Sequence, residues 1–195
     1  MPRISAPTLV EHRANQRAAV LGAAEELAVE QGAAAVTVAA VAARTGIARP
    51  SVYAYFASAD AILEALVHEG FERWRTALDA GIAATTSPEE LVRGYFAAAA
   101  ASAARGDHRL AGTLRDVRLA PEVRQTLLDS HRATAAPLAE AARALGVPDV
   151  DQALALLLTV LNHCLTRVEA GHEAATEGRT AAEFALGGLD RLARG

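Results

Sequence analysis

The stretch "TVAAVAARTGIARPSVYAYF", residues 37–56, determines the fold expected for the N-terminal part of this chain. Thr37 is a good N-cap for a helix with Val38 and Val41 turned inward, and this helix is expected to end at Thr45-Gly46. A second helix should have Pro50 as its first residue, with Arg49 as its cap, because proline disfavours helical geometry in the residue before it. The pattern therefore predicts two short helices joined by a tight turn.

The second helix carries an unusual concentration of aromatic residues. Only 4% of the chain is aromatic, yet Tyr53, Tyr55 and Phe56 lie within four consecutive positions. Val52 and Phe56 are four residues apart and are expected to face inward, which turns the two tyrosines outward. All three aromatics could simply pack a small core, and for Phe56 we prefer that interpretation.

A helix-turn-helix places its second helix in the major groove of DNA, and this helix begins with the groups that such a role requires. Arg49 can bond the O6 and N7 of guanine, Ser51 offers a donor, and Pro50 can touch a thymine methyl. Tyr53 and Tyr55 can donate to phosphates. No Asp or Glu occurs from Gln31 to Ala59, where Arg44 and Arg49 are the cations. The candidate DNA-binding residues from this pattern are Arg44, Arg49, Pro50, Ser51, Tyr53 and Tyr55.

The rest of the chain reads as helices without strands, which predicts an all-α fold. An alanine-rich composition of this kind favours helices. The helix at 153–168 is expected to begin after Pro148, and the last helix at a capping box formed by Thr180 and Glu183. The ranges expected to be helical are 17–31, 60–74, 87–106, 109–117, 121–145, 153–168 and 180–192. The run "LALLLTVL" at residues 154–161 is apolar on nearly all sides and must be buried against the protein or a partner.

Composition limits the cellular setting. The single Cys164 rules out an internal disulfide framework. No apolar run of about 18 residues and no signal peptide is visible, so we expect a cytoplasmic protein. The net charge of −4 does not by itself suggest nucleic-acid binding. The prediction of DNA binding therefore depends on the local pattern of residues 37–56.

Residues 17–67 resemble the tetracycline-repressor (TetR) family of transcriptional regulators. The resemblance rests on "AAEELAVEQG", "TVAAVAARTGIA" and "SVYAYFASADAILEALV", with Thr37, Gly46, Tyr53 and Phe56 at the family's spacing. It implies about nine helices, and it implies that Thr37, Tyr53 and Tyr55 contact DNA phosphates. The expected organisation is a flexible arm at 1–16, a DNA-binding domain at 17–58, and a ligand-binding and dimerisation domain at 59–195.

Function and partners follow from the same resemblance. It implies a homodimer, joined through the helices at 151–170 and 180–193, that represses transcription from a palindromic operator and is released by a small apolar inducer. No cofactor is expected. Two positions depart from the family pattern: Ala48 stands where Ser or Thr caps the helix, and Ala59 where a lysine contacts phosphate.

The inducer site is expected among the C-terminal helices. Leucines in this region would make it mainly apolar, and a few polar residues could orient a ligand. For each polar residue, a solvated face or a satisfied core position is an equal alternative. The candidate ligand-binding residues are Tyr95, Leu114, Arg118, Leu128, His131, Leu157, Asn162 and His163.

Two other classes of protein remain to be considered. A helical di-metal enzyme needs Glu-x-x-His on two helices, and only Glu169 and His172 have that spacing. His163 and Cys164 are neighbours on a helix and would not converge on a metal. We therefore expect neither catalysis nor a metal site. The second alternative is a ligand-binding or interaction protein that has lost DNA binding. The missing lysine at Ala59 favours this alternative, whereas the intact Arg49, Tyr53 and Tyr55 oppose it.

Overall fold

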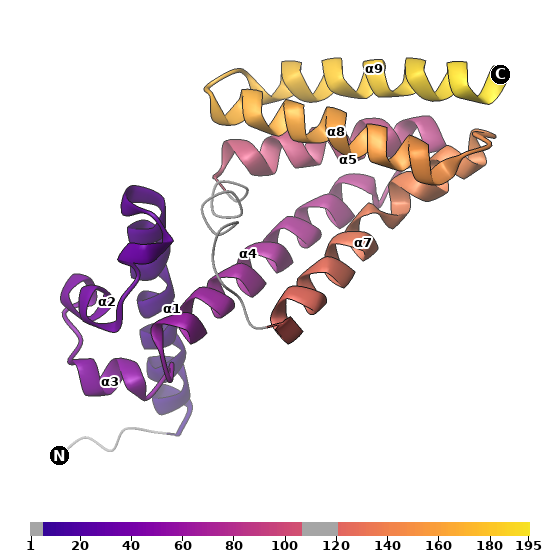
Figure 1. The fold of residues 1–195 in the computed structure, drawn as a ribbon. Helices are drawn as coiled ribbons and strands as arrows, with labels where there is room; N and C mark the ends of the chain where they lie inside the picture. The colour runs from indigo at the N-terminus through magenta and orange to yellow at the C-terminus, as the bar shows by residue number, and fades with distance from the viewer. Residues whose placement is uncertain (1–5, 107–120) are drawn as a thin grey trace. The chain divides into compact units, whose positions relative to one another are not determined.

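The computed structural model describes residues 6–106 and 121–195, and in this part of the chain all regular structure is helical. Eight α-helices and one short 3₁₀ helix are present there (Figure 1). The described residues fall into two compact units, an N-terminal unit of residues 6–69 and a C-terminal unit of residues 70–106 and 121–195. None of the described helices is long and apolar enough to cross a membrane. The expected helix at 109–117 lies outside the described residues.

The first helix, α1 (Ala6–Gln31), begins well before the predicted start at Arg17. The prediction followed apolar periodicity, which starts only at Val20, whereas side chains from Val10 to Asn15 are exposed. A helical segment without a continuous apolar face gives no such signal. The described part of the expected flexible arm, residues 6–16, is therefore helical.

The N-terminal unit is held together by one core of aliphatic side chains. The 3₁₀ turn η1 (Ala33–Ala35) connects α1 to α2 (Val38–Thr45), and α3 (Arg49–Tyr53) and the start of α4 (Ala59–Ile82) follow. Val41, Val52 and Ile62 are fully buried in this core. Phe56 is also buried, as predicted, and the guanidinium of Arg17 lies 5.3 Å from the centre of its ring. Each short helix thus gains its stability from packing rather than from its own length.

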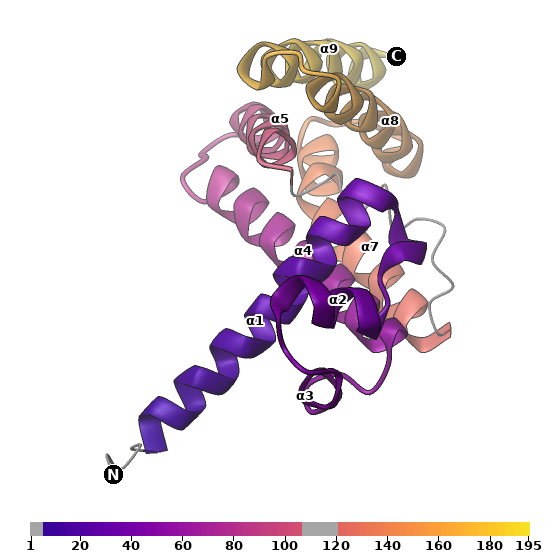
Figure 2. The same ribbon diagram turned by 90° about the vertical axis from the view of Figure 1, so that its left-hand side faces the viewer.

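In the C-terminal unit, the helix α5 (Pro88–Ala104) packs against three others. Its neighbours are α7 (Pro121–Ala144), α8 (Val150–Glu169) and α9 (Ala174–Arg194), as Figures 1 and 2 show. Phe96 is the largest of the fully buried side chains in this core. A Cβ added at Gly94 would lie 2.5 Å from the carbonyl oxygen of Gly81, so α5 approaches the end of α4 at a point where only glycine fits.

In this unit, the helix start predicted at residue 87 is confirmed, and the start predicted at residue 180 is wrong. Ser87 caps α5, accepting a hydrogen bond of 3.1 Å from the N–H of Glu90. The predicted capping box of Thr180 and Glu183, by contrast, lies inside α9, which begins at Ala174. Gly171, with φ of 96°, ends the preceding helix and allows the chain to turn into α9.

Candidate nucleic-acid interface

The turn between α2 and α3 is built by local hydrogen bonds. The Oγ1 of Thr37 accepts a hydrogen bond of 3.1 Å from the N–H of Ala40 and so caps α2, as predicted. At the other end, the hydroxyl of Thr45 donates to the carbonyl of Val41 at 2.8 Å. Gly46 then adopts φ of 70°, a left-handed conformation that a side chain would strain. These contacts fix the angle at which the chain enters α3.

Helix α3 presents a polar face beside a buried one. Val52 has 0% exposure, whereas Arg49 and Pro50 are exposed, Ser51 is half-buried and Tyr53 is 56% exposed. Among the described residues, none forms an ion pair with Arg49. The side chains expected to read bases therefore come from one short, anchored helix.

The start of α3 differs from the prediction by one residue. Arg49 is the first helical residue rather than the cap, and the cap position is held by Ala48, whose side chain makes no hydrogen bond. The carbonyl of Ala48 accepts the N–H of Ser51 at 2.8 Å. Because Pro50 has no N–H to satisfy, it fits this first turn without a capping side chain.

Thr37 can both cap a helix and bind a phosphate. Capping uses a lone pair on Oγ1, so the hydroxyl hydrogen is still available to donate. The side chain lies at the exposed N-terminus of α2, where the helix dipole also favours an anion. Its position is compatible with the predicted contact to a DNA phosphate.

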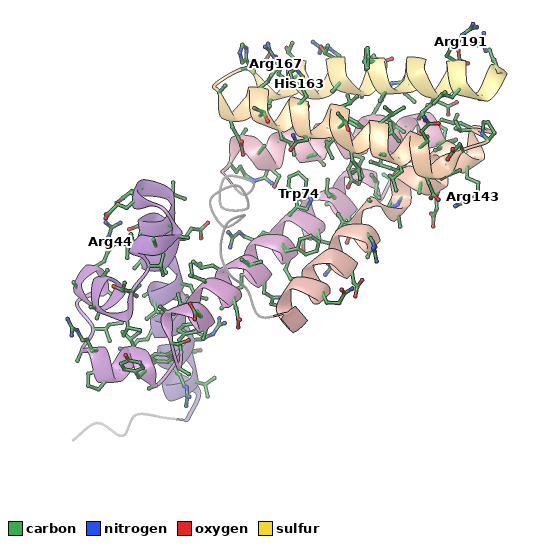
Figure 3. The ribbon with its side chains drawn as sticks, in the orientation of Figure 1. Arg44, Trp74, Arg143, His163, Arg167 and Arg191 are labelled. Atoms are coloured by element: carbon green, nitrogen blue, oxygen red, sulfur yellow. The ribbon has the colours of Figure 1, made fainter. Side chains whose placement is uncertain are left out.

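Arg44, by contrast, is bound to carboxylates of its own unit. Its guanidinium donates to Glu30 at 2.8 Å and to Glu26 at 3.5 Å, both on α1 (Figure 3). The hydrogen bond from Arg44 lowers the pKa of Glu30 below its ordinary value. Paired in this way, Arg44 ties α2 to α1 and has fewer N–H donors left for its expected contact with DNA.

Tyr55 is also engaged within the N-terminal unit. Its hydroxyl donates to Oε1 of Gln16 at 2.6 Å, and the guanidinium of Arg13 lies 5.9 Å from the centre of its ring. The side chain is half-buried rather than turned fully outward as expected. Sequence reasoning missed Gln16 because it was assigned to a flexible arm. Its place four residues before the buried Val20, on the same face of a helix, was the available signal.

The candidate ligand-binding residues are dispersed. Tyr95 is buried, its hydroxyl donates to the carbonyl of Thr134 at 3.2 Å, and burial raises its pKa far above the ordinary value. Leu157 is buried in the same core, whereas Asn162 and His163 are exposed on α8. Two candidates, Leu114 and Arg118, lie outside the described residues, as do the side chains of Leu128 and His131.

A surface groove of the C-terminal unit contains none of these candidates. The groove, of about 250 Å³, is lined mainly by residues 85–88, with Leu91 and Glu140 beside them. The predicted set of ligand-binding residues is therefore not assembled into a site by the described residues.

The histidines and the cysteine considered for metal binding either contact other side chains or do not face one another. His172 lies beyond the end of α8, with Nδ1 3.2 Å from a nitrogen of Arg167. Arg167 in turn makes a two-pronged ion pair with Glu177, at 2.8 and 2.9 Å. His163 (Figure 3) is exposed while Cys164 is buried, so the two side chains do not converge. Within the described parts of the chain, no group of three His, Cys, Asp or Glu residues could hold a metal ion.

A protein-family model matches the segment of the chain that contains α2 and α3. The model of the family described as bacterial regulatory proteins, tetR family, matches residues 20–66, which span α2 and α3. No curated protein matches the sequence.

Solved structures share the fold at low sequence identity. The TetR-family regulator PfmR from Thermus thermophilus is 22% identical over 86% of this chain and 96% of its own, with a TM-score of 0.74. The regulator FadR from Bacillus subtilis, solved with stearoyl-CoA, is 20% identical over 88% and 98%, with a TM-score of 0.72. The ketosteroid regulator KstR2 of Mycobacterium tuberculosis is 22% identical over 89% and 94%, with a TM-score of 0.73.

The family match covers the capped α2, the turn and the exposed face of α3, in a chain whose fold is that of these regulators. Residues 20–66 thus resemble the N-terminal segment of TetR-family regulators, and the chain shares the fold of the solved structures.

Proposed function

We propose that the protein is a repressor that binds a palindromic operator as a homodimer and is released by a small apolar molecule. The observation that carries this proposal is the exposed polar face of α3, held by the buried Val52 and preceded by a turn closed at Gly46. Such a helix can enter the major groove while the core behind it stays intact.

On this proposal the residues of α3 divide into two roles. Arg49 reads a base, with its fork of donors directed at a guanine, while Pro50 and Ser51 make the shorter contacts beside it. Thr37 and Tyr53 donate to phosphates, which fix the position of the helix but not the preferred sequence. Loss of Arg49 should change base preference, whereas loss of the Tyr53 hydroxyl should weaken binding to every sequence.

The homodimer is proposed to form through the outer faces of α8 and α9. Leu157 and Leu161 helped to motivate this expectation but are buried within the unit itself. The most exposed of the large apolar side chains on these helices are instead Leu156, 52% exposed, on α8 and Phe184, 72% exposed, on α9. Two exposed apolar groups on adjacent helices suit a contact that a two-fold axis repeats.

Light scattering at micromolar concentration tests the dimer. The wild type should have twice the mass of the chain, and replacing Leu156 and Phe184 with Ser should give a folded monomer, because neither side chain belongs to the monomer core. A monomeric wild type would contradict both the dimer and the palindromic operator. Thr159→Ser, an exposed change on α8, is a matched control that should remain dimeric.

The inducer is proposed to be apolar because the C-terminal unit is rich in buried aliphatic residues. One structure of similar fold holds stearoyl-CoA, which has a long apolar acyl chain, and another is called a ketosteroid regulator, a name that refers to a largely apolar ring system. A ligand that favours a different spacing of the two α3 helices would lower operator affinity.

Thermal shift and DNA binding together test the inducer proposal. Acyl-CoA thioesters and sterols are screened for compounds that raise the melting temperature of the protein, and each such compound is then added to the operator complex. Compounds that stabilise the protein should weaken operator binding. If they left operator affinity unchanged, the release model would be wrong, while DNA recognition by α3 would stand.

A further inference from the structure

Residues 13–16 of α1 lie against Tyr55, in the segment that follows α3. Figures 1 and 2 both draw the N-terminal end of α1 and α3 at the same end of the N-terminal unit. Two contacts join them: the hydroxyl of Tyr55 to Gln16, and the guanidinium of Arg13 over the ring of Tyr55. Residues 39 positions apart in the sequence are thus brought together beside the proposed DNA-reading helix.

The geometry of the first contact fixes which group donates. A separation of 2.6 Å is typical of O–H···O bonds and shorter than the usual range for N–H···O bonds, so the phenol is the donor and Oε1 of Gln16 the acceptor. A tyrosine hydroxyl has only one hydrogen. Phosphate oxygens on a DNA backbone accept hydrogen bonds, so Tyr55 cannot donate to one while it donates to Gln16.

Unlike Tyr55, Arg13 still has N–H groups available to donate to a phosphate. It is exposed on α1, and the described residues provide it with no ion pair. It also lines an open groove of about 430 Å³ together with Val10, His12, Ala54 and Tyr55, and this lining contains no carboxylate. A guanidinium over an aromatic face keeps its N–H groups at the ring's edge and outward, available to an anion.

We propose that Arg13 is a phosphate-binding residue of the DNA interface, and that Tyr55 and Gln16 are positioning residues that hold it there. This inference rests on the proposed binding of an operator by α3. It also gives a role to residues 11–15 of α1, whose exposed side chains contribute nothing to the core. The anion is a phosphate of the DNA backbone, so the contact adds affinity without base preference.

The test is the salt dependence of binding to an operator obtained by selection with the wild-type protein. Each phosphate contact by a cation contributes about 0.9 to the slope of log K against log salt concentration. Arg13→Gln should therefore reduce the slope by about 0.9 for each half-site, while Arg13→Lys keeps it. Arg143→Gln, an exposed arginine on α7 of the C-terminal unit, is the matched control and should leave the slope unchanged.

A double-mutant cycle separates positioning from direct contact by Tyr55. Tyr55→Phe should weaken binding by roughly fivefold per half-site in the wild type, through loss of the Gln16 bond, but have little effect in Arg13→Gln. Urea unfolding of each variant shows that the N-terminal unit is intact.

Each outcome decides between the claims. An unchanged slope for Arg13→Gln, with a wild type that binds its operator, would overturn the phosphate role and leave the proposed function standing. Equal effects of Tyr55→Phe in both backgrounds would overturn the positioning role, since Tyr55 would then act independently. A wild type that selects no DNA sequence would contradict the proposed function itself, and this inference with it.

Discussion

Thr37 is predicted to serve two purposes that substitutions can separate. Its Oγ1 caps α2 through the N–H of Ala40 at 3.1 Å, and α2 has only eight residues with no acidic side chain in its first turn. Nothing else in that turn replaces the cap, so Thr37→Ala should lower the free energy of unfolding by about 1 kcal/mol. For a urea m-value of about 2 kcal/mol/M, the midpoint should fall by about 0.5 M.

The same substitution should weaken DNA binding, because the hydroxyl hydrogen is proposed to reach a phosphate. A hydrogen bond to a charged group contributes about 1.5 kcal/mol or more, so Thr37→Ala should cost about tenfold in affinity per half-site. Thr37→Ser keeps both functions and should resemble the wild type. Thr37→Asp keeps the cap and suits the helix dipole, but its carboxylate only accepts hydrogen bonds and repels phosphate. It should be as stable as the wild type and bind DNA more weakly than Thr37→Ala.

The assays are urea unfolding followed by circular dichroism, and binding to a selected operator at one fixed salt concentration. Ser87→Ala is the control, since it removes a cap of the same 3.1 Å length from α5 in the C-terminal unit. It should lose similar stability without loss of DNA affinity. If Thr37→Asp bound the operator as tightly as the wild type, the N-terminus of α2 would not face DNA and the reasoning would be refuted.

Three further predictions concern stability and reactivity. Gly94→Ala should destabilise the protein by about 1–3 kcal/mol in urea, because its Cβ would meet a backbone carbonyl of α4, while Gly22→Ala, whose Cβ meets nothing within 4 Å, should not. Arg167 holds the pKa of Glu177 below the ordinary 4.5, so this carboxylate adds stability above that pH and loses it as pH falls through the lowered value. The stability difference between the wild type and Glu177→Gln, measured in urea, should therefore be present at neutral pH and vanish in acid; a difference independent of pH would contradict the assignment. Burial raises the pKa of Cys164, so an aromatic disulfide reagent should label this thiol only as the protein unfolds, and rapid labelling of the native state would show that the thiol is accessible.

Local signals explain what could be predicted of the fold. The bounds of α2 follow from Thr37 at one end and Gly46 at the other, because each residue acts on backbone groups a few positions away. The same type of signal failed for α9, where Thr180 and Glu183 have the right spacing but lie inside a helix that had already begun. A capping box is informative only where the chain before it is not helical, and its spacing alone does not show this.

Local signals also explain which part of the candidate DNA-binding site could be predicted. The outward direction of Tyr53 follows from the inward direction of Val52, its neighbour in the chain. The partners of Arg44 and Tyr55 could not be found in this way, since Glu30 and Gln16 lie on α1 and reach them only through the packing of the unit. Long-range hydrogen bonds of this kind leave no periodic pattern in the sequence.

Selection from random DNA sequences tests the central claim most directly, with the wild type and Arg49→Ala compared at one salt concentration. The wild type should enrich a palindrome with half-sites about one helical turn apart. Arg49→Ala should enrich the same palindrome with relaxed preference at one base of each half-site, and should lose about 1–3 kcal/mol per half-site. Unchanged base preference in Arg49→Ala would show that α3 docks differently, and a wild type that enriches no palindrome would contradict the account of this protein as an operator-binding repressor.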